Sequence, residues 1–511
     1  MTMARTWAFA LTGIHAAPVE VEADLSAQTP DFRLIGLPDK SLGEAVQRVH
    51  NACANSELPL PRRRLTINLS PASLPKHGSG FDVAIAIAAL ATEHVFRPGS
   101  LAETVHLGEL GLDGRLRPVP GILPAVLGAR DAGFRRVVVP HANTAEARLV
   151  EGMDVLGAAS LAEVVCWHGL AVDVGEVVPV AMPSSASTAM AANDELELGD
   201  VIGQRDAVDA LVAAAAGGHH VMMSGPPGAG KTMLARRLPG ILPSLSDDAA
   251  LRVASVRSVS GAPVTALDRT PPFEAPHHSA SVAALVGGGS RVVRPGAIAR
   301  AGEGVLFLDE AAEFPRHVLD SLRQPLETGR IVIHRAGFVA DFPARFQLVV
   351  ATNPCPCGNY GVKGAECICP PQAIRRYLGR LSGPLLDRID IELHVLRITS
   401  VAAREESARL TTAQARERVG VARDRAQRRL RETPWRRNAD VDGAWLRHGP
   451  FALKAATRRP LDAALHRGAL TLRAYDRVLR VAWSLADLDG LDAVQLDHVG
   501  RALYLKKGFT A

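Results

Sequence analysis

Residues 219–238 read HHVMMSGPPGAGKTMLARRL, and they give the strongest structural signal in the chain. The apolar start predicts a strand, the Gly-rich middle a tight loop, and the segment from Met233 a helix. This order is the context of a phosphate-binding loop, in which backbone N–H groups and a helix N-terminus favour an anion. The stretch therefore predicts a nucleotide-binding α/β domain. The alternative is a Gly-rich turn that fits the pattern by chance.

The residues of this loop have separate expected roles. The glycines let the backbone wrap the phosphates, Lys231 reaches the β and γ phosphates, and the Thr232 hydroxyl can ligate Mg²⁺. We expect one set of residues to hold the nucleoside triphosphate and its Mg²⁺: Gly225, Pro226, Pro227, Gly228, Ala229, Gly230, Lys231, Thr232 and Asp309.

Two later apolar strands end in polar residues suited to hydrolysis. VLFLDE, residues 305–310, predicts a buried strand that ends in Asp309, which would hold Mg²⁺ through water, and Glu310, which would act as general base. FQLVVATNP ends in Asn353, whose amide can position the attacking water. The alternatives are an acidic pair that begins a helix and an Asn that caps a loop before a proline.

Arginines supply a third candidate group. Arg388 in SGPLLDRIDI, residues 382–391, is the expected arginine finger, and an ordinary ion pair with its neighbouring aspartates is the alternative. A finger that acts on a neighbouring copy requires a ring, so Arg388 also predicts a homo-oligomer. Three arginines share one face of the helix predicted at 470–488, and the first is expected to meet nucleotide unless the face is merely solvated: Arg473, Arg477 and Arg480.

Four of the six cysteines lie between residues 353 and 372, in NPCPCGNYGVKGAECICPPQ. They form two Cys-x-Cys pairs, Cys355 with Cys357 and Cys367 with Cys369. Four thiolates this close in sequence suit a tetrahedral structural Zn²⁺ site, which leaves no open position for catalysis. Reduced thiols in a loop and a redox-labile pair remain the alternatives.

The length and composition of the chain limit how many domains it contains and what kind of protein it is. A chain of 511 residues predicts several domains, and a Ser-, Ala- and Pro-rich stretch at 177–197 predicts a linker. No apolar run is long enough to span a membrane, and the cysteine spacing is unlike a secreted disulfide framework, so a cytoplasmic protein without a membrane partner is expected. The net charge of +5 fits a nucleic-acid partner, and it equally fits a codon bias toward Arg.

Four segments follow from the pattern along the chain. Residues 1–176 alternate strand and helix signals, with a first strand at the N-terminus, a hairpin that turns at Asp113-Gly114, and a helix followed by a strand within 124–140. After the linker, residues 198–397 form the α/β block with its Cys-rich loop at 355–369, and residues 398–511 are helical.

The motifs together resemble the magnesium chelatase-like branch of AAA+ ATPases, and most closely its YifB/ComM family. The strings that carry the resemblance are FEAPHHSASVAALVGGG (273–289), RPGAIARAGEGVLFLDEAAEF (294–314), LRQPLETG (322–329), NPCPCG (353–358) and SGPLLDRIDI (382–391). The resemblance implies an α/β multidomain fold with a central AAA+ domain and a C-terminal helical lid. It also implies ATP as the nucleotide, a hexameric ring with DNA in its pore, a sensor role for Arg473, and branch migration of the kind used in natural transformation.

Residues 1–176 resemble the Lon-protease-like fold, an α+β fold of the ribosomal S5 domain 2-like type. LPKHGSGFDVAIA, residues 74–86, stands where such proteases carry a nucleophilic Ser, and that position is Gly80 here. The position of the catalytic Lys falls at or beside Ala125. A Ser–Lys dyad needs both groups, so no protease activity is expected, although Lys76 and Ser79 would be the residues of a displaced dyad. The domain is expected to serve as a platform for DNA binding or ring assembly.

Two basic segments are candidates for gripping phosphates in a pore. One spans residues 276–300 and contains His277, His278, Arg291 and Arg294, although the two histidines would equally form a packed loop pair. The other is the hairpin predicted at 329–346, with His334 and Arg335 at its tip. In the Arg-rich region 404–437 a shared helical face carries Arg409, Arg416 and Arg423, for which a solvated, salt-bridged helix or DNA contact is expected.

The sequence favours an ATPase that translocates single-stranded or branched DNA. The alternatives are an ATPase that remodels a protein client, a nucleotide switch without catalysis, and an ATP-dependent protease. Glu310 argues against the switch, and the missing Ser–Lys pair argues against the protease.

Overall fold

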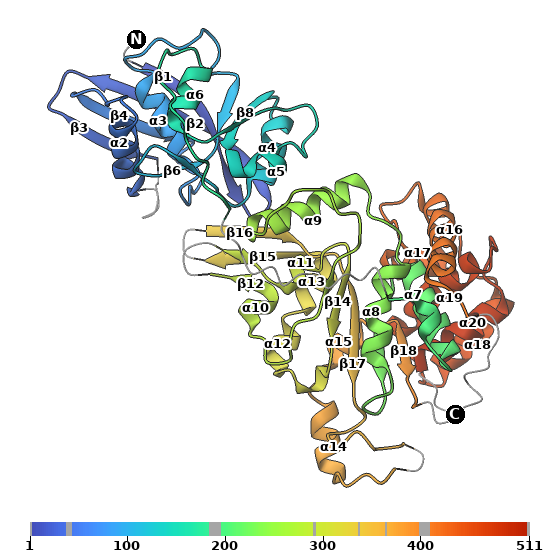
Figure 1. Ribbon diagram of the computed structural model, residues 1–511. Helices are drawn as coiled ribbons and strands as arrows, with labels where there is room; N and C mark the ends of the chain where they lie inside the picture. Colours follow the sequence, from blue (N-terminus) through green and yellow to red (C-terminus); the bar gives the residue numbers. More distant parts are fainter. Residues whose placement is uncertain are drawn as a thin grey trace.

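The computed structural model describes residues 3–36, 43–182, 196–289, 293–335, 338–362, 365–397 and 409–507. Figure 1 shows three bodies in chain order: an N-terminal body of strands and helices, a central α/β body, and a helical body at the C-terminal end. The predicted linker lies between the first two bodies. Its residues 177–182 have no regular secondary structure, and 183–195 lie outside the described residues.

The N-terminal body is built on a seven-stranded mixed sheet of order β3-β4-β2-β1-β5-β8-β9. The strand predicted at the N-terminus is confirmed as the first strand of this sheet, and the chain then turns back at Gly13 (φ +69) into an antiparallel partner strand that the sequence did not indicate. The strands of the seven-stranded sheet are β1 (Met3–Thr12), β2 (His15–Ser26), β3 (Asp31–Ile35), β4 (Arg64–Ser70), β5 (Thr104–His106), β8 (Arg136–Pro140) and β9 (Asp154–Ala158).

Helices pack on this sheet through alternating apolar residues of its strands. The helices are α2 (Ala45–Asn55), α3 (Asp82–Leu90), α4 (Ile122–Asp131), α5 (Thr144–Ala147) and α6 (Leu161–Trp167). The predicted hairpin is confirmed as β6 (Glu109–Leu110) and β7 (Leu116–Arg117), and Gly114 in its turn has φ +79. The predicted helix followed by a strand is α4 followed by β8.

The central body contains a parallel five-stranded sheet of order β11-β14-β17-β10-β18. Its strands are β10 (Val221–Ser224), β11 (Phe273–Glu274), β14 (Val305–Leu308), β17 (Gln347–Thr352) and β18 (Ile391–His394). Successive residues of β14 point to opposite faces, so Val305 and Phe307 enter one apolar cluster and Leu306 and Leu308 another. Burial on both faces explains why this strand is continuously apolar.

Helices and short hairpins surround the central sheet. The helices are α7 (Arg205–Gly217), α8 (Lys231–Ile241), α9 (Asp247–Val259), α10 (Val282–Val286), α11 (Ala297–Arg300), α12 (Arg316–Asp320), α13 (Arg323–Thr328), α14 (Pro371–Leu378) and α15 (Gly383–Leu386). The predicted hairpin before Asn353 is confirmed as β15 (Arg330–Arg335) paired with β16 (Phe338–Pro343). A two-residue pairing joins β12 (Gly287–Gly288) to β13 (Arg294–Pro295).

From residue 409 the described chain is helical, as predicted. It forms α16 (Thr412–Leu430), α17 (Gly443–His448), α18 (Ala455–His466), α19 (Leu472–Leu488) and α20 (Leu496–Lys507). Apolar residues of α19, among them Leu479 and Trp483, share one core with α7 and with one face of the central sheet. The helical body therefore packs directly on the nucleotide-binding body.

The arginines expected on a solvated or DNA-contacting face have another role. Arg416 Nε donates to Gly240 O at 2.8 Å, and Arg423 donates to Ala215 O through Nε and Nη2 at 3.0 and 2.7 Å. The acceptors are carbonyls in the last turns of α8 and α7, where helices leave carbonyls unpaired. These two arginines hold α16 against its own chain, while Arg409 and Arg416 are exposed, as the solvated-face alternative predicted, and Arg423 is partly buried. Arg404 at the start of the region lies outside the described residues.

The N-terminal and central bodies are in direct contact. Gly121 N donates to Ser258 O at 3.1 Å, which joins the start of α4 to α9. The β1–β2 turn meets β16 so closely that a Cβ on Gly13 would overlap the backbone carbonyl of Asp341. Ile14 in the same turn packs against the apolar cluster that contains Phe342. The turn that the sequence did not predict is thus one place where the bodies meet, and the packing of α4 on α9 is another.

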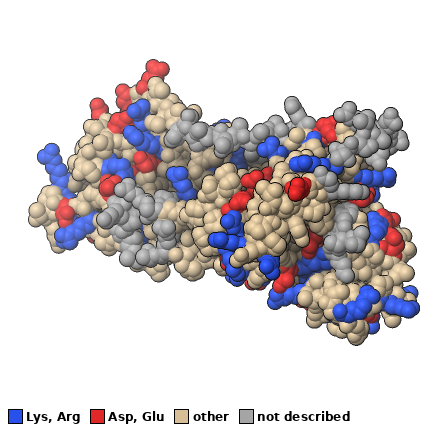
Figure 2. Space-filling model, turned by 90° about the horizontal axis from the view of Figure 1, so that it is seen from below, with Lys and Arg blue, Asp and Glu red and all other residues tan. Residues whose placement is uncertain are grey.

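The face shown in Figure 2 carries Lys and Arg interspersed with Asp and Glu. No helix among the described residues is both long enough and apolar enough to cross a membrane.

Candidate nucleotide site

The phosphate-binding loop joins β10 to α8 at the carboxyl edge of the central sheet. Parallel strands flank β10 on both sides, and ligands of such sheets bind at this edge. Gly228 and Gly230 have φ of +73 and +95, left-handed values that glycine adopts without strain. Because α8 begins at Lys231, its first N–H groups lie at the end of the loop. The predicted strand, loop and helix are confirmed.

Lys231 lies under the loop and is nearly buried. Its Nζ donates to Gly225 O at 2.6 Å, to Pro226 O at 3.0 Å and to Asn353 Oδ1 at 3.0 Å. Burial lowers the pKa of Lys231, and the carboxylates of Asp309 and Glu310 oppose that shift. The predicted lysine and the predicted strand-end amide are therefore in contact, although they are far apart in sequence.

The residues expected to hold Mg²⁺ lie together. Thr232 Oγ1 donates to Asp309 Oδ2 at 2.7 Å, from the first turn of α8 to the end of β14. A hydroxyl and a carboxylate oxygen are hard ligands of the kind that Mg²⁺ prefers, and two protein ligands suit an ion that keeps several waters. Thr232 and Asp309 would therefore hold Mg²⁺, which would supply positive charge to neutralise a bound triphosphate.

Glu310 adopts an unusual backbone conformation. Its φ of +50 and ψ of +44 are left-handed, which a non-glycine residue rarely adopts, and strain of this kind is common at functional sites. Its N–H donates to Asp309 Oδ1 at 3.0 Å. Its Oε2 lies 3.4 Å from Nδ1 of His278, whose ring packs on His277 with centroids 4.0 Å apart. The two histidines form the packed loop pair that was the alternative to pore contacts, and His278 also lies beside the expected general base.

Asn353 follows β17 directly, and its surroundings fix its position. Thr352 Oγ1 donates to the carbonyl oxygen of Asn353 at 3.1 Å, and burial raises the pKa of Tyr377, which approaches both residues from α14. The amide of Asn353 is thereby held where its oxygen accepts from Lys231.

Two further residues contact the loop and were missed by the sequence reasoning. Gln204 Nε2 donates to Ala229 O at 2.7 Å and to Leu396 O at 3.2 Å, and its buried Oε1 has no hydrogen-bond partner among the described residues. Arg397 Nε donates to Pro227 O at 2.9 Å and is one of the charges that lower the pKa of Lys231. Neither belongs to a motif whose spacing marks phosphate chemistry, so only the fold could identify them.

Arg388 and Arg473 lie away from this cluster, in a second cleft. The cleft has a volume of about 260 Å³ and is lined by Leu326, Glu327, Asp387, Arg388, Arg473, Asp476, Arg477 and Arg480. None of the described loop residues 225–232 is among them. Arg388 pairs with Glu327, and Arg473 Nη1 lies 3.3 Å from Asp387 Oδ2 with its side chain 75% exposed. Burial, then the charges of Arg477 and Arg473, lowers the pKa of Arg388.

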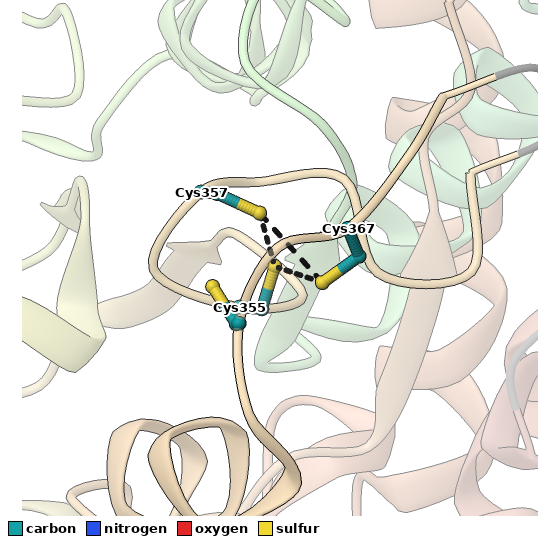
Figure 3. Close-up of side chains that lie close together, drawn as sticks. Cys355, Cys357 and Cys367 are labelled. Carbon is teal, nitrogen blue, oxygen red and sulfur yellow. Dashed lines mark hydrogen bonds between the residues drawn. The ribbon is translucent and has the colours of Figure 1, made fainter.

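The four clustered cysteines converge as the spacing suggested. Cys355 Sγ lies 3.3 Å from Cys357 Sγ and 3.7 Å from Cys367 Sγ, and the latter two sulfurs are also 3.7 Å apart (Figure 3). With Cys369 included, all four sulfurs lie within 4.8 Å of one another. A hydrogen bond from the backbone of Asn359, followed by that from Cys355, lowers the pKa of Cys357 to about 6. The cluster lies in the loop between β17 and α14.

The basic segments predicted to grip phosphates are only partly described. In the first, Arg294 is exposed on β13, and Arg291 lies outside the described residues. In the second, His334 is exposed near the end of β15, and the side chain of Arg335 lies outside the described residues.

The displaced-dyad residues of the N-terminal body bond separate partners. Lys76 is buried, and its Nζ donates to the carbonyls of Gly36, Leu69 and Pro71. Ser79 Oγ instead donates to Glu109. Burial lowers the pKa of Lys76, but its donors are used by three carbonyls.

Comparisons with known proteins agree with this architecture. The family model for subunit ChlI of magnesium chelatase matches residues 197–403, and related models match residues 21–143 and, as the ChlI C-terminal part, 409–506. An uncharacterized protein of Mycobacterium tuberculosis is 47% identical over 99% of both chains. Competence protein ComM of Haemophilus influenzae is 40% identical over 98% of this chain and 97% of its own, and the YifB protein of Escherichia coli is 39% identical over 97% and 95%.

Family membership of this kind implies ATP and Mg²⁺ as ligands and ATP hydrolysis as the activity, which suits the residues gathered around Lys231 and Asp309. The chain belongs to the magnesium chelatase-like AAA+ ATPases, and within them to the family of YifB and ComM.

Proposed function

We propose that this chain assembles into a homo-hexameric ring in which ATP hydrolysis drives translocation on single-stranded or branched DNA, with branch migration of recombination intermediates as its task. The observation that carries the proposal is the separation of two half-sites on one chain. The phosphate loop gathers Lys231, Asp309, Glu310 and Asn353, whereas Arg388 and Arg473 line a different cleft. Two copies are needed to bring both halves to one triphosphate.

The proposed roles at the phosphate loop follow from position and chemistry. Lys231 and the loop N–H groups bind the β and γ phosphates, and Thr232 with Asp309 holds Mg²⁺. Asn353 orients the attacking water, and Glu310 accepts its proton. The side chain of Glu310 is half exposed and its Oε2 lies 3.4 Å from His278 Nδ1, so we expect Glu310 to move away from His278 when it approaches that water.

The opposite half-site would come from the neighbouring copy. Arg388 is proposed as the finger that stabilises charge on the transferring phosphate, and Arg473 as the sensor beside it, because both guanidinium groups line the same cleft. Their acidic partners, Glu327 and Asp387, hold the guanidinium groups until a phosphate competes for them.

DNA is the proposed substrate on three grounds: the exposed cations of segment 276–300 and of the β15–β16 hairpin, the net charge of +5, and the relative that bears the name competence protein. Phosphate contacts of this kind move a strand without reading its sequence. The N-terminal body, proposed as Lon-protease-like, would serve as the DNA-binding or assembly platform. We place the protein in the cytoplasm.

The four cysteines are proposed to hold a structural Zn²⁺. An ion with four sulfurs at about 2.3 Å separates them by roughly 3.8 Å, the edge of that tetrahedron. The sulfur distances of 3.3, 3.7 and 3.7 Å lie close to this value and far above the length of a disulfide.

A complementation experiment tests the shared site. Lys231→Ala removes the phosphate half and Arg388→Ala removes the finger half, so each variant alone should lose most of its ATPase activity. Mixed rings pair the intact phosphate loop of one variant with the intact finger of the other. We expect a clear recovery of activity on mixing. Two inactive variants that stay inactive when mixed, although they co-assemble, would place Arg388 outside the neighbour's site.

The alternative function is remodelling of a protein client, and the reason to consider it is the similarity to the motor subunit of magnesium chelatase. The ATPase rate separates the two, measured alone, with single-stranded DNA, with four-way-junction DNA and with an unfolded protein. DNA should raise the rate severalfold, with the junction at least equal to the single strand. Stimulation by unfolded protein alone would favour the rival, and a particle that stays monomeric with ATP and DNA would exclude the ring.

A further inference from the structure

We propose that the four-cysteine loop is a metal-dependent clamp on the phosphate-binding loop, so that Zn²⁺ loading sets the affinity for ATP. This rests on the proposed Zn²⁺ site, and it adds a function to an ion that would otherwise only stabilise a loop.

The first observation is the contact between the two loops. Gly358 lies between the cysteine pairs, with φ +79, and a Cβ placed on it would overlap the ring of Pro227. Gly358 N donates to Cys355 O at 3.0 Å, so the position of this glycine depends directly on the first cysteine. The backbone of the cysteine loop therefore lies directly against Pro227 in the phosphate-binding loop.

The second observation concerns both ends of the cysteine loop. The loop begins at Asn353, whose Oδ1 accepts from Lys231 at 3.0 Å, and Cys355, the most buried of the four cysteines, is only two residues later. It ends at α14, whose buried Tyr377 lies close enough to Thr352 and to the backbone of Asn353 for both to influence its pKa. Both ends and the middle of the loop thus contact residues that place ATP.

The third observation is how little else would hold this loop. It contains no helix or strand between β17 and α14 among its described residues, and Tyr360 and Ile368 within it are 55% and 83% exposed. A segment without a core or a hydrogen-bonded ladder needs another cross-link to stay fixed. Four converging sulfurs supply one when a metal joins them, because a four-thiolate site closes the loop upon itself.

The clamp has a defined consequence for binding. With the metal, Gly358 supports Pro227, and Asn353 is held at Lys231, so the phosphate loop is preorganised. Without the metal, the phosphate-binding loop has to become ordered when ATP binds, and the entropy lost in this ordering weakens the affinity for ATP.

The experiment uses the full-length chain and two readouts that need neither DNA nor hydrolysis. Zinc content is measured by elemental analysis, and ATP affinity by titration with a fluorescent ATP analogue, before and after metal removal with a thiol reagent and chelator. We expect about one Zn²⁺ per chain and at least a fivefold rise in the Kd for ATP on removal. Reversal of the thiol modification followed by added Zn²⁺ should restore the Kd, and Cys166→Ser, an exposed cysteine outside the cluster, should change neither readout.

A pair of glycine variants keeps the test valid if the apo protein unfolds. Gly358→Ala places its methyl group against Pro227, whereas Gly361→Ala, with φ +71 in the same loop, has open space at that position. Both variants bear the same left-handed strain and should keep their zinc. Only Gly358→Ala should weaken ATP binding, again at least fivefold.

The outcomes separate the hypotheses. Protein without zinc overturns the metal site, and unchanged ATP affinity after complete zinc loss overturns the clamp. Equal ATP affinity of the two glycine variants also overturns it. Failure of DNA to stimulate hydrolysis would instead refute the proposed function and leave the clamp intact.

Discussion

Single residues at this site combine an exposed catalytic group with buried support. Glu310 extends from strained backbone and is 54% exposed, whereas Lys231, which it faces, is 8% exposed. The base is therefore free to move while the phosphate-binding lysine is not. Changes at Glu310 should alter turnover, and changes at its histidine partner should alter how often the base is available.

Glu310→Gln should bind ATP with nearly unchanged affinity and hydrolyse it about 100-fold more slowly or worse. The amide keeps the size of the side chain but does not accept the proton of the attacking water. Steady-state ATPase rates together with a nucleotide titration measure the two effects. Normal turnover would remove Glu310 from the mechanism.

His278→Ala should raise the basal ATPase rate, by about two- to fivefold, without changing ATP affinity. The substitution removes the contact between Nδ1 and the Glu310 carboxylate at 3.4 Å, so the base spends more time near the phosphate. His277→Ala is the matched control, because His277 bonds Ser279 rather than Glu310. A rate that falls in His278→Ala would show that the histidine assists catalysis instead.

At the scale of elements, the helical body is attached by arginines that cap helix ends. Arg423 of α16 reaches Ala215 O near the end of α7, and burial lowers its pKa to about 10. Such charged caps satisfy carbonyls that a helix leaves unpaired. Removing Arg423 and Arg416 separately compares how much a buried and an exposed arginine of this kind contribute to the free energy of unfolding.

Arg423→Ala should lower the free energy of unfolding by about 2 kcal/mol, because a buried carbonyl loses two charged hydrogen bonds. Arg416→Ala, on the same face but exposed, should cost less than about 1 kcal/mol. Chemical denaturation of both variants measures the difference. Equal losses would mean that the depth of burial does not matter at this interface.

Elements with strong local signals were predictable, and elements defined by contact were not. The loop around Lys231, the strand before Asp309 and the hairpin before Asn353 all follow from periodicity and glycine placement. The spacing of Arg416 and Arg423 correctly placed both on one helical face, but spacing does not tell which partner lies opposite. Gln204 and Arg397 were missed for the same reason, since contact with the loop is a property of the folded chain.

At the scale of the whole molecule, the N-terminal body and the nucleotide-binding body meet at a backbone-to-backbone contact. Gly13 in the β1–β2 turn lies against Asp341 of β16. The sequence indicated one strand here, because the turn consists of Gly13 and Ile14 within a long run of strand-forming residues. The arrangement of bodies was therefore the part of the fold that the sequence did not indicate.

Gly13→Ala should loosen this contact, because the methyl group would overlap Asp341 O and the backbone has φ +69. We expect faster cleavage between the bodies in limited proteolysis and a loss of stability of about 1–3 kcal/mol. Gly152→Ala, with φ +82 and open space in the same body, bears the backbone strain alone. Identical behaviour of the two variants would show that the Asp341 contact contributes nothing.

The contact at Asp341 also limits how far the β15–β16 hairpin can reach. Asp341 lies three positions along β16 from Phe338, the first residue of that strand, which is a length of about 10 Å at roughly 3.3 Å per residue. If the hairpin pivots at Asp341, it has to rotate by roughly 20° to move its tip by about 3.4 Å, the spacing of one nucleotide along the proposed DNA substrate. A rotation of that size is large for a short hairpin, and a smaller one would suffice only if Asp341, and the N-terminal body in contact with it, moved as well.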